Sequence, residues 1–248
     1  MKRVSIITGV LLALSAFQGE AGDLIAHWQF DGGSGNIVED SSSNGHTGEI
    51  LGLGESIKWV PGKYGYALAF SSSVGEKGEN SKGYVIFKKM PSEFPNGLTL
   101  TAWIKLNRFR DKKKPHGLAF QEIISNAKTH IGPGFRFTLF YKSILFRSGD
   151  GKEYQNAMSN RELTEIPDDV WVNIVIVYDP ENSKALVYLN GMKTGESKGA
   201  FVLTKGRDAW SVGGCFGYAS LNGAIDEIKI YNRPLSGQEI LNEYNMNR

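Results

Sequence analysis

Acidic side chains near the two ends of the chain are the residues best suited to chemistry in this sequence. Near the C-terminal end, period-two alternation places Asp226 on the same strand face as Ile228 and Ile230. A carboxylate among apolar neighbours needs a partner, because burial of an unpaired charge is costly. Asp31 follows the first strand-like run, so the two carboxylates meet if the first and last strands pair.

The loop after Asp31 supplies further oxygen atoms, from Asp40, from the amide of Asn44 and from backbone carbonyls. Calcium prefers a shell of about six to eight such oxygens, and a loop rich in Gly and Ser can wrap the ion. The sequence therefore predicts a structural Ca²⁺ ion, fastening the two chain ends, with the ligands Asp31, Asp40, Asn44 and Asp226. The alternative is that Asp31 caps a turn and that Asp226 pairs with Arg233 or with a backbone amide.

Two of the five tryptophans are candidates for ligand binding. Trp59 and Trp210 lie near the ends of strand-like runs or in loops, where an exposed indole ring stacks well on a sugar. The alternative for both is packing at the rim of the fold. Trp28, Trp103 and Trp171 lie within strand-like runs and are expected to be buried or half-buried.

The predicted strand that contains Asp226 lacks the pattern of a catalytic site. Sandwich glycosidases that retain configuration need two carboxylates close together on one strand, in the pattern E-x-D-x-x-E, and no Glu stands two places before Asp226. Alternation also points Glu227 away from Asp226, so the two are not expected to share a substrate. No G-x-S-x-G elbow, phosphate loop or zinc spacing occurs, and we expect no enzymatic activity.

Alternating apolar and polar residues recur from Leu24 onward without helix-like periods between them, which is typical of a sandwich or barrel. Residues 171–178 are nearly all apolar and predict a central strand. Residues 135–147 predict a hairpin, and Asn190-Gly191 is the strongest short hairpin signal. The tail predicts one short helix, because Ser236 and Glu239 form a capping box.

The N-terminal residues have the layout of a secretory signal peptide: a basic start, an apolar run to Phe17 and small residues around a cut after Ala21. The apolar run is shorter than the roughly 20 residues that a spanning helix needs. We therefore expect a signal peptide over residues 1–21, one domain over residues 22–248, no membrane span, and a protein that is secreted, periplasmic or at the cell surface.

Charge and cysteine content narrow the range of partners. The formal net charge is +2, which gives no electrostatic case for nucleic acid. Cys215 is the only cysteine, so no disulfide can form within the chain; it is expected to be a small buried hydrophobe. The basic loop 108–117 is expected to be solvated, with contact to an acidic polysaccharide as the alternative.

Several segments, taken in order, resemble the laminin-G-like, concanavalin-A-like jelly-roll domains of exported proteins. The segments are Trp28–Asp31, Asp40–Gly48, Gly62–Phe70, Leu98–Lys105, Val170–Val175, Leu186–Gly191 and Gly223–Ser236. Ser43 departs from the family pattern, which usually has Gly there, and Asn173 departs from a common His. The resemblance implies a two-sheet antiparallel jelly-roll sandwich, all-β apart from the short C-terminal helix, with the terminal strands paired and often with a structural calcium.

The resemblance and the residues together lead to an expected function. We expect an exported, calcium-stabilised binding module that recognises an extracellular carbohydrate. The alternatives are a module for adhesion or for interaction with a surface protein and, less favoured by the residues, a diverged polysaccharide lyase or glycoside hydrolase. Fold-level likeness does not fix a ligand.

Overall fold

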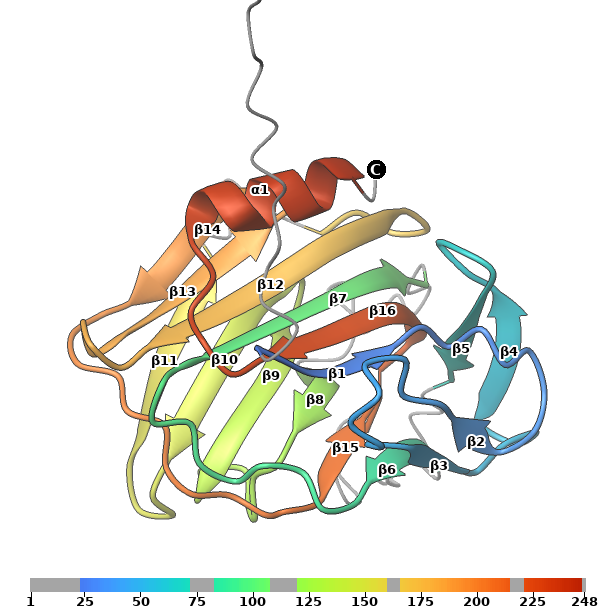
Figure 1. Ribbon diagram of the computed structural model, residues 1–248, viewed down its shortest axis with the longest axis horizontal. Helices are drawn as coiled ribbons and strands as arrows, with labels where there is room; N and C mark the ends of the chain where they lie inside the picture. The colour runs from blue at the N-terminus through green and yellow to red at the C-terminus, as the bar shows by residue number, and fades with distance from the viewer. Residues whose placement is uncertain (1–22, 72–82, 108–119, 160–165, 215–220, 247–248) are drawn as a thin grey trace, which may run out of the picture.

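Antiparallel strands and one short helix make up the part of the chain that the computed structural model describes, namely residues 23–71, 83–107, 120–159, 166–214 and 221–246 (Figure 1). The first strands are β1 (Leu24–Trp28), β2 (Ile37–Val38), β3 (Gly48–Leu51), β4 (Ile57–Pro61), β5 (Tyr66–Phe70), β6 (Tyr84–Phe87), β7 (Leu98–Leu106) and β8 (Phe120–Ser125). The later elements are β9 (Gly134–Phe140), β10 (Ser143–Gly149), β11 (Tyr154–Ser159), β12 (Trp171–Asp179), β13 (Lys184–Leu189), β14 (Met192–Ser197), β15 (Trp210–Val212), β16 (Gly223–Tyr231) and α1 (Gly237–Met246).

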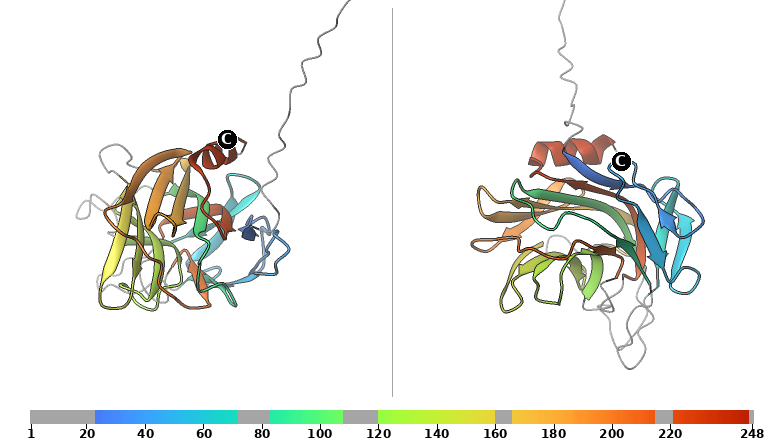
Figure 2. Two further views of the ribbon diagram at one scale, coloured as in Figure 1. Left: turned by 60° about the vertical axis from the view of Figure 1, so that its left-hand side comes forward. Right: turned by 60° about the horizontal axis from the view of Figure 1, so that its bottom comes forward.

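The strands follow a single hydrogen-bonded path that folds over on itself into two facing layers (Figure 2). One layer runs β6-β15-β8-β9-β10-β11 and the other runs β14-β13-β12-β7-β16-β5. The predicted antiparallel sandwich is confirmed. The layers are not two separate sheets, however, because residues 157–159 of β11 pair with residues 195–197 of β14 and join them along one side.

The main core fills the space between the layers and is rich in aromatic rings. Trp28 stacks on Phe87 with ring centroids 3.5 Å apart, and Trp210 meets Phe135 edge to face. A second, smaller core lies on the outer face of β12 and β13, where α1 covers Val175 and Val177. The run 171–178 is therefore a central strand buried on both faces, as predicted.

The local signals of hairpin and helix are also confirmed. Asn190 and Gly191 join β13 to β14 with φ values of 50° and 78°, the positive pair that a type I′ turn requires. At the start of α1, the Ser236 N–H donates to the Glu239 carboxylate at 2.7 Å and the Glu239 N–H donates to Ser236 Oγ at 3.2 Å. This reciprocal pair is a capping box.

The two terminal strands lie side by side, as the sequence resemblance implied. β1 pairs antiparallel with β16, and the pairing starts at Leu24 and Tyr231. Just before it, the Arg233 guanidinium binds the Asp23 carboxylate at 2.6 Å. β16 therefore changes its neighbour along its length, from β5 at residues 223–225 to β1 at residues 228–231.

Some predictions fall on residues outside the described part: the signal peptide (1–21), the single cysteine at position 215 and the basic loop (108–117). Within the described part, no helix combines the length and the apolar character needed to cross a membrane.

Candidate functional site

A β-bulge in β16 decides where its acidic residues point. Asp226 pairs with Trp103 of β7 and Lys229 pairs with Thr101, so two residues of β16 stand opposite one residue of β7. Glu227 adopts a positive φ of 49° at this point, which is typical of a bulge. The bulge shifts the alternation by one residue, so Ile228 faces the main core while Asp226 lies on the outer face.

Two sequence predictions are therefore wrong. Asp226 does not share the face of Ile228 and Ile230, and Glu227 does not point away from Asp226. Glu227 lines a small hollow on the outer face together with Trp103, the cross-strand partner of Asp226. Period-two alternation cannot foresee this, because one extra residue reverses every side chain that follows.

Asp226 and Asp31 bind the same tight turn, residues 62–65, which joins β4 to β5. Asp226 Oδ2 accepts the N–H groups of Lys63 and Tyr64 at 2.8 and 3.1 Å. Asp31 Oδ1 accepts the N–H of Tyr66, the next residue, at 3.0 Å. The two carboxylates are thus brought to one place, and for Asp226 the partner is a backbone amide, one of the alternatives that the sequence left open.

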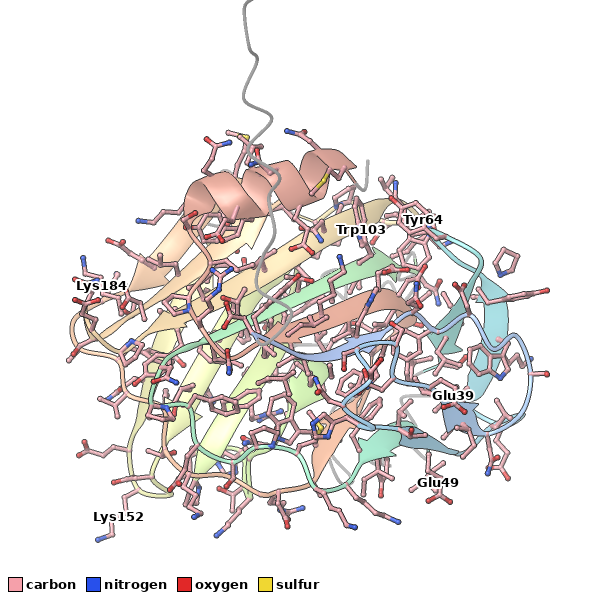
Figure 3. The ribbon with its side chains drawn as sticks, in the orientation of Figure 1. Glu39, Glu49, Tyr64, Trp103, Lys152 and Lys184 are labelled. Carbon is pink, nitrogen blue, oxygen red and sulfur yellow. The ribbon has the colours of Figure 1, made fainter. Side chains whose placement is uncertain are left out.

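The glycines of this turn are needed for that approach. A Cβ atom at Gly65 would collide with the Asp31 carboxylate, and one at Gly62 would lie 2.6 Å from Asp226 Oδ2. Lys63 projects over two rings, with its Nζ 4.4 Å from the Trp103 centroid and 5.5 Å from that of Tyr64. Figure 3 shows Tyr64 and Trp103 close together on this face.

Burial dominates the electrostatics of Asp226, whose side chain is 0% exposed. Burial raises the pKa of Asp226 to about 7, with a further rise from the charge of Glu227, and the N–H groups of Tyr64, Lys63 and Glu227 oppose the change. Glu227 itself binds the imidazole of His27 at 2.7 Å.

Asp40 and Asn44 bind the free edge of β1, not the 62–65 turn. Asp40 accepts the N–H of His27 at 3.0 Å, and its other oxygen accepts the N–H of His46 at 2.9 Å. Asn44 Nδ2 donates to the carbonyls of Leu24 and Ile25. Residues 40–46 therefore take the place of a neighbouring strand along β1.

Ser43, which departs from the family pattern, has a φ of 71°. This left-handed conformation explains why Gly is usual there. The pKa of Asp40 is lowered: burial raises it, but the N–H of His27, the hydroxyl and N–H of Ser42 and the N–H of His46 outweigh that effect.

The four predicted calcium ligands do not form one oxygen shell in this arrangement. Backbone N–H groups hold the carboxylates, and Asn44 uses its amide nitrogen. Among the described residues, no three His, Cys, Asp or Glu side chains gather in a way that could hold a metal. The calcium ion therefore stays a prediction.

The two candidate tryptophans lie in different environments. Trp59, in β4, is half-buried under the 31–36 loop and donates its indole N–H to the carbonyl of Gly35 at 2.9 Å. Trp210 is 0% exposed and donates its indole N–H to the carbonyl of Pro91. A buried ring cannot stack on a surface ligand, so Trp210 is a core residue; its assignment to ligand binding is corrected.

A hollow on the described surface lies where β11 and β14 meet. Its volume is about 710 Å³, within the usual range for ligand pockets. We name it the β11–β14 groove, and its lining residues are Tyr154, Gln155, Asn156, Met158, Ser159, Thr194, Gly195, Glu196, Lys198 and Ala200. The two strands pair over residues 157–159 of β11 and 195–197 of β14. Residues 154–156 and 198–200 are not paired with each other, so they form separate walls of the groove.

Tyr154 is the aromatic residue of this groove, and its side chain is half exposed at 49%. The guanidinium of Arg147, on the adjacent strand β10, lies 4.1 Å from the centroid of its ring. Arg147 also donates from Nε to Asn156 Oδ1 at 3.0 Å. The ring and the amide are thus both held in place before any ligand arrives.

The remaining lining is polar. Gln155 Oε1 accepts the N–H of Val202 at 2.7 Å, which fixes the amide at the edge of the groove. Because Asn156 Oδ1 is engaged by Arg147, its Nδ2 is the atom that can donate to a ligand. Sequence reasoning missed this groove: the only signal was an aromatic residue soon after an Asp-Gly turn, and the strand β11 was not predicted.

Comparison with protein families gives one match. The family model for the concanavalin A-like lectin/glucanases superfamily matches residues 79–241. The comparison with curated proteins found no match.

Comparison with solved structures finds relatives of the fold at low sequence identity. Domain 4 of AbnA, a GH43 extracellular arabinanase from Geobacillus stearothermophilus solved with arabinotriose, is 20% identical with a TM-score of 0.64, over 89% of this chain and 97% of that one. The binding domain of Paraclostridial Mosquitocidal Protein 1 is 16% identical with a TM-score of 0.70, over 91% of this chain and 52% of that one. The binding domain of botulinum neurotoxin DC, solved with rat synaptotagmin II, is 14% identical with a TM-score of 0.68, over 92% and 52%. The chain thus spans about half of each toxin binding domain, and these likenesses show the fold alone.

Proposed function

The chain belongs to the concanavalin A-like lectin/glucanases superfamily, and on that premise we propose that it is a glycan-binding module whose site is the β11–β14 groove. The observation that carries the proposal is Tyr154, a half-exposed ring in the wall of a polar groove, held by the guanidinium of Arg147. A sugar presents a C–H face that packs on such a ring and hydroxyl groups that amides can bind.

Rigidity supports this function. A side chain that must be ordered on binding costs about 0.5–1.5 kcal/mol, and Tyr154 and Asn156 are already held by Arg147. Glu196, the carboxylate in the groove, forms an ion pair with Lys193 at 2.7 Å. We therefore propose binding in this groove without catalysis.

The relatives of the fold support binding as the general role. Domain 4 of AbnA was solved with arabinotriose, and a botulinum neurotoxin DC binding domain was solved with rat synaptotagmin II. Both a sugar and a protein are thus found on this architecture. For this chain, the polar groove with one aromatic wall favours the sugar, and a protein partner is the alternative that the experiment must separate.

We also propose that the module acts outside the cytoplasm. The support is the amino-acid sequence, in which residues 1–21 have the order of basic, apolar and small residues found in signal peptides.

A glycan array probed with the protein lacking residues 1–21, followed by titration calorimetry, tests the function. We expect Tyr154→Ala to weaken binding by at least about tenfold, or about 1.4 kcal/mol, because Tyr is among the residues whose truncation to Ala costs most binding energy at interfaces. Tyr66→Ala is the matched control: Tyr66 is equally exposed, at 48%, but lies in β5, far from the groove along the strand order. Absence of binding to any glycan, or equal loss in both variants, would show the proposal to be wrong.

A further inference from the structure

We propose that the glycan recognised by the β11–β14 groove carries carboxylate groups, and that Arg147 and Lys198 receive them. This inference rests on the proposed glycan-binding function and adds the chemical class of the ligand. The charged residues around the groove differ in whether they form ion pairs.

Among the described residues Arg147 forms no ion pair at contact distance, and the buried carboxylate of Glu122 acts on it only through its charge. Its side chain contacts are the Asn156 amide, a distant carbonyl of His130 at 3.5 Å and two aromatic rings. The neighbouring cation on the same sheet face, Arg136, is different, because it binds the buried carboxylate of Glu122 through Nε at 3.1 Å and Nη2 at 2.5 Å. Glu122 is thus already engaged.

The guanidinium of Arg147 lies near two aromatic rings. It lies 4.1 Å from the centroid of Tyr154 and 5.8 Å from that of Phe120. Burial lowers the pKa of Arg147, which means that its charge is partly removed from water. Arg136 and Arg147 share the single carboxylate of Glu122, so one positive charge stays uncompensated. A planar guanidinium matches a carboxylate with two parallel hydrogen bonds.

Lys198 is the second cation without an acidic partner among the described residues, and it lines the groove itself. The other charged residue in the lining, Glu196, forms an ion pair with Lys193, which lies outside the lining. The groove therefore has one cation without an ion pair in its lining, Lys198, and a second one, Arg147, that contacts the lining residues Tyr154 and Asn156.

A second hollow shares Tyr154 and Gln155 with the groove and has acidic residues in its lining. Its volume is about 220 Å³, and the acidic residues are Asp150 and Glu153. A carboxylate would be repelled from that hollow and attracted to the side of Arg147 and Lys198. Because the net charge of the whole chain is only +2, this attraction is local to the groove and does not follow from the overall charge.

Titration calorimetry with matched pairs of sugars tests the inference. The pairs are hexagalacturonate with its methyl ester, hexamannuronate with mannohexaose, and sialyllactose with lactose. We expect at least one acidic sugar to bind at least about tenfold more tightly than its neutral counterpart, because hydrogen bonds to charged groups contribute about 1.5–3 kcal/mol. The preference should shrink as salt is raised, since a partly exposed ion pair is screened.

Arg147→Met should weaken binding of the acidic sugar by a larger factor than binding of its neutral counterpart, which loses only the support that Arg147 gives to Tyr154. Arg147→Lys should keep part of the preference. Lys58→Met is the matched control, because it removes one exposed positive charge from β4, distant from the groove along the strand order. Lys198→Met gives a second test if Arg147→Met lowers the unfolding temperature.

Three outcomes would overturn the inference, and they differ in what they say of the proposed function. Binding of the neutral sugars as tightly as the acidic ones would leave glycan binding in place and exclude acidic recognition. Equal loss of acidic and neutral binding in Arg147→Met would reduce Arg147 to a support for Tyr154. Absence of binding to every sugar of the panel would reject this inference together with the proposed function.

Discussion

Asp226 holds the 62–65 turn against the sheet through hydrogen bonds to backbone N–H groups. Its two oxygens accept three backbone N–H groups, from Lys63, Tyr64 and its own neighbour Glu227. Asp31 accepts one, at a site exposed to solvent. The two carboxylates that the sequence predicted as metal ligands thus both stabilise this turn without a metal, and Asp226 contributes more hydrogen bonds than Asp31.

Replacement of each carboxylate should therefore have a different effect on stability. We expect Asp226→Ala to lower the free energy of unfolding by about 3 kcal/mol, because it strands several buried donors, and Asp31→Ala to lower it by about 1 kcal/mol or less. Chemical denaturation of both variants measures the difference. Equal effects would mean that the turn is held by other contacts.

At the scale of elements, α1 is fastened by charge as well as by its apolar side. Arg233 binds Glu239 in the first turn of the helix at 2.9 Å and Asp23 at 2.6 Å. Burial raises the pKa of Glu239, but hydrogen bonds from Ser236 and Arg233, and the charge of Arg233, outweigh it and hold that pKa below the usual 4.5.

This lowered pKa predicts an acid-sensitive contribution to stability. A carboxylate whose pKa is lowered by folding stabilises the native state fully above its unfolded pKa, and that contribution is lost as the pH falls through the lowered value. Glu239→Gln should therefore unfold at a lower temperature than the wild type at about pH 7, and the difference should vanish towards about pH 3. A difference independent of pH would show that the charge of Glu239 does not matter.

The elements themselves differ in how far the sequence predicted them. The helix, the Asn190-Gly191 hairpin and the central strand β12 follow from local patterns: a capping box, two positive φ angles and an apolar run. The bulge at Glu227 and the strand β11 do not, because one depends on which strands flank β16 and the other has an exposed, polar sequence. The predicted strand face of Asp226 was therefore wrong, and the β11–β14 groove was not predicted.

At the scale of the whole molecule, the antiparallel sandwich was predictable because the order of many weak motifs is specific, whereas the site was not. The motif Asp40–Gly48 was read as ion ligands, but its side chains bind the edge of β1. The β11–β14 groove arises where the two layers join, between strands that are not consecutive in the chain. No sequence pattern reports that junction.

The predicted calcium ion would tie the two ends of the chain and should be visible as a change in global stability. We expect the unfolding temperature, measured with excess chelator and then with millimolar calcium, to rise on addition; at a concentration one hundred times the dissociation constant the gain is about 2.7 kcal/mol. Asp226→Ala should abolish the rise. No change with calcium would leave Asp31, Asp40, Asn44 and Asp226 as ordinary hydrogen-bonding residues.

The pairing of β1 with β16 has a mechanical consequence. Residue 23 and the start of α1 lie at the same end of this strand pair, where Arg233 binds both Asp23 and Glu239. A pulling force applied between residue 23 and the helix would thus peel β1 from β16 one hydrogen bond after another, in place of shearing them all at once. Arg233 would carry the load first, and its two ion pairs would set the force at which the domain starts to open.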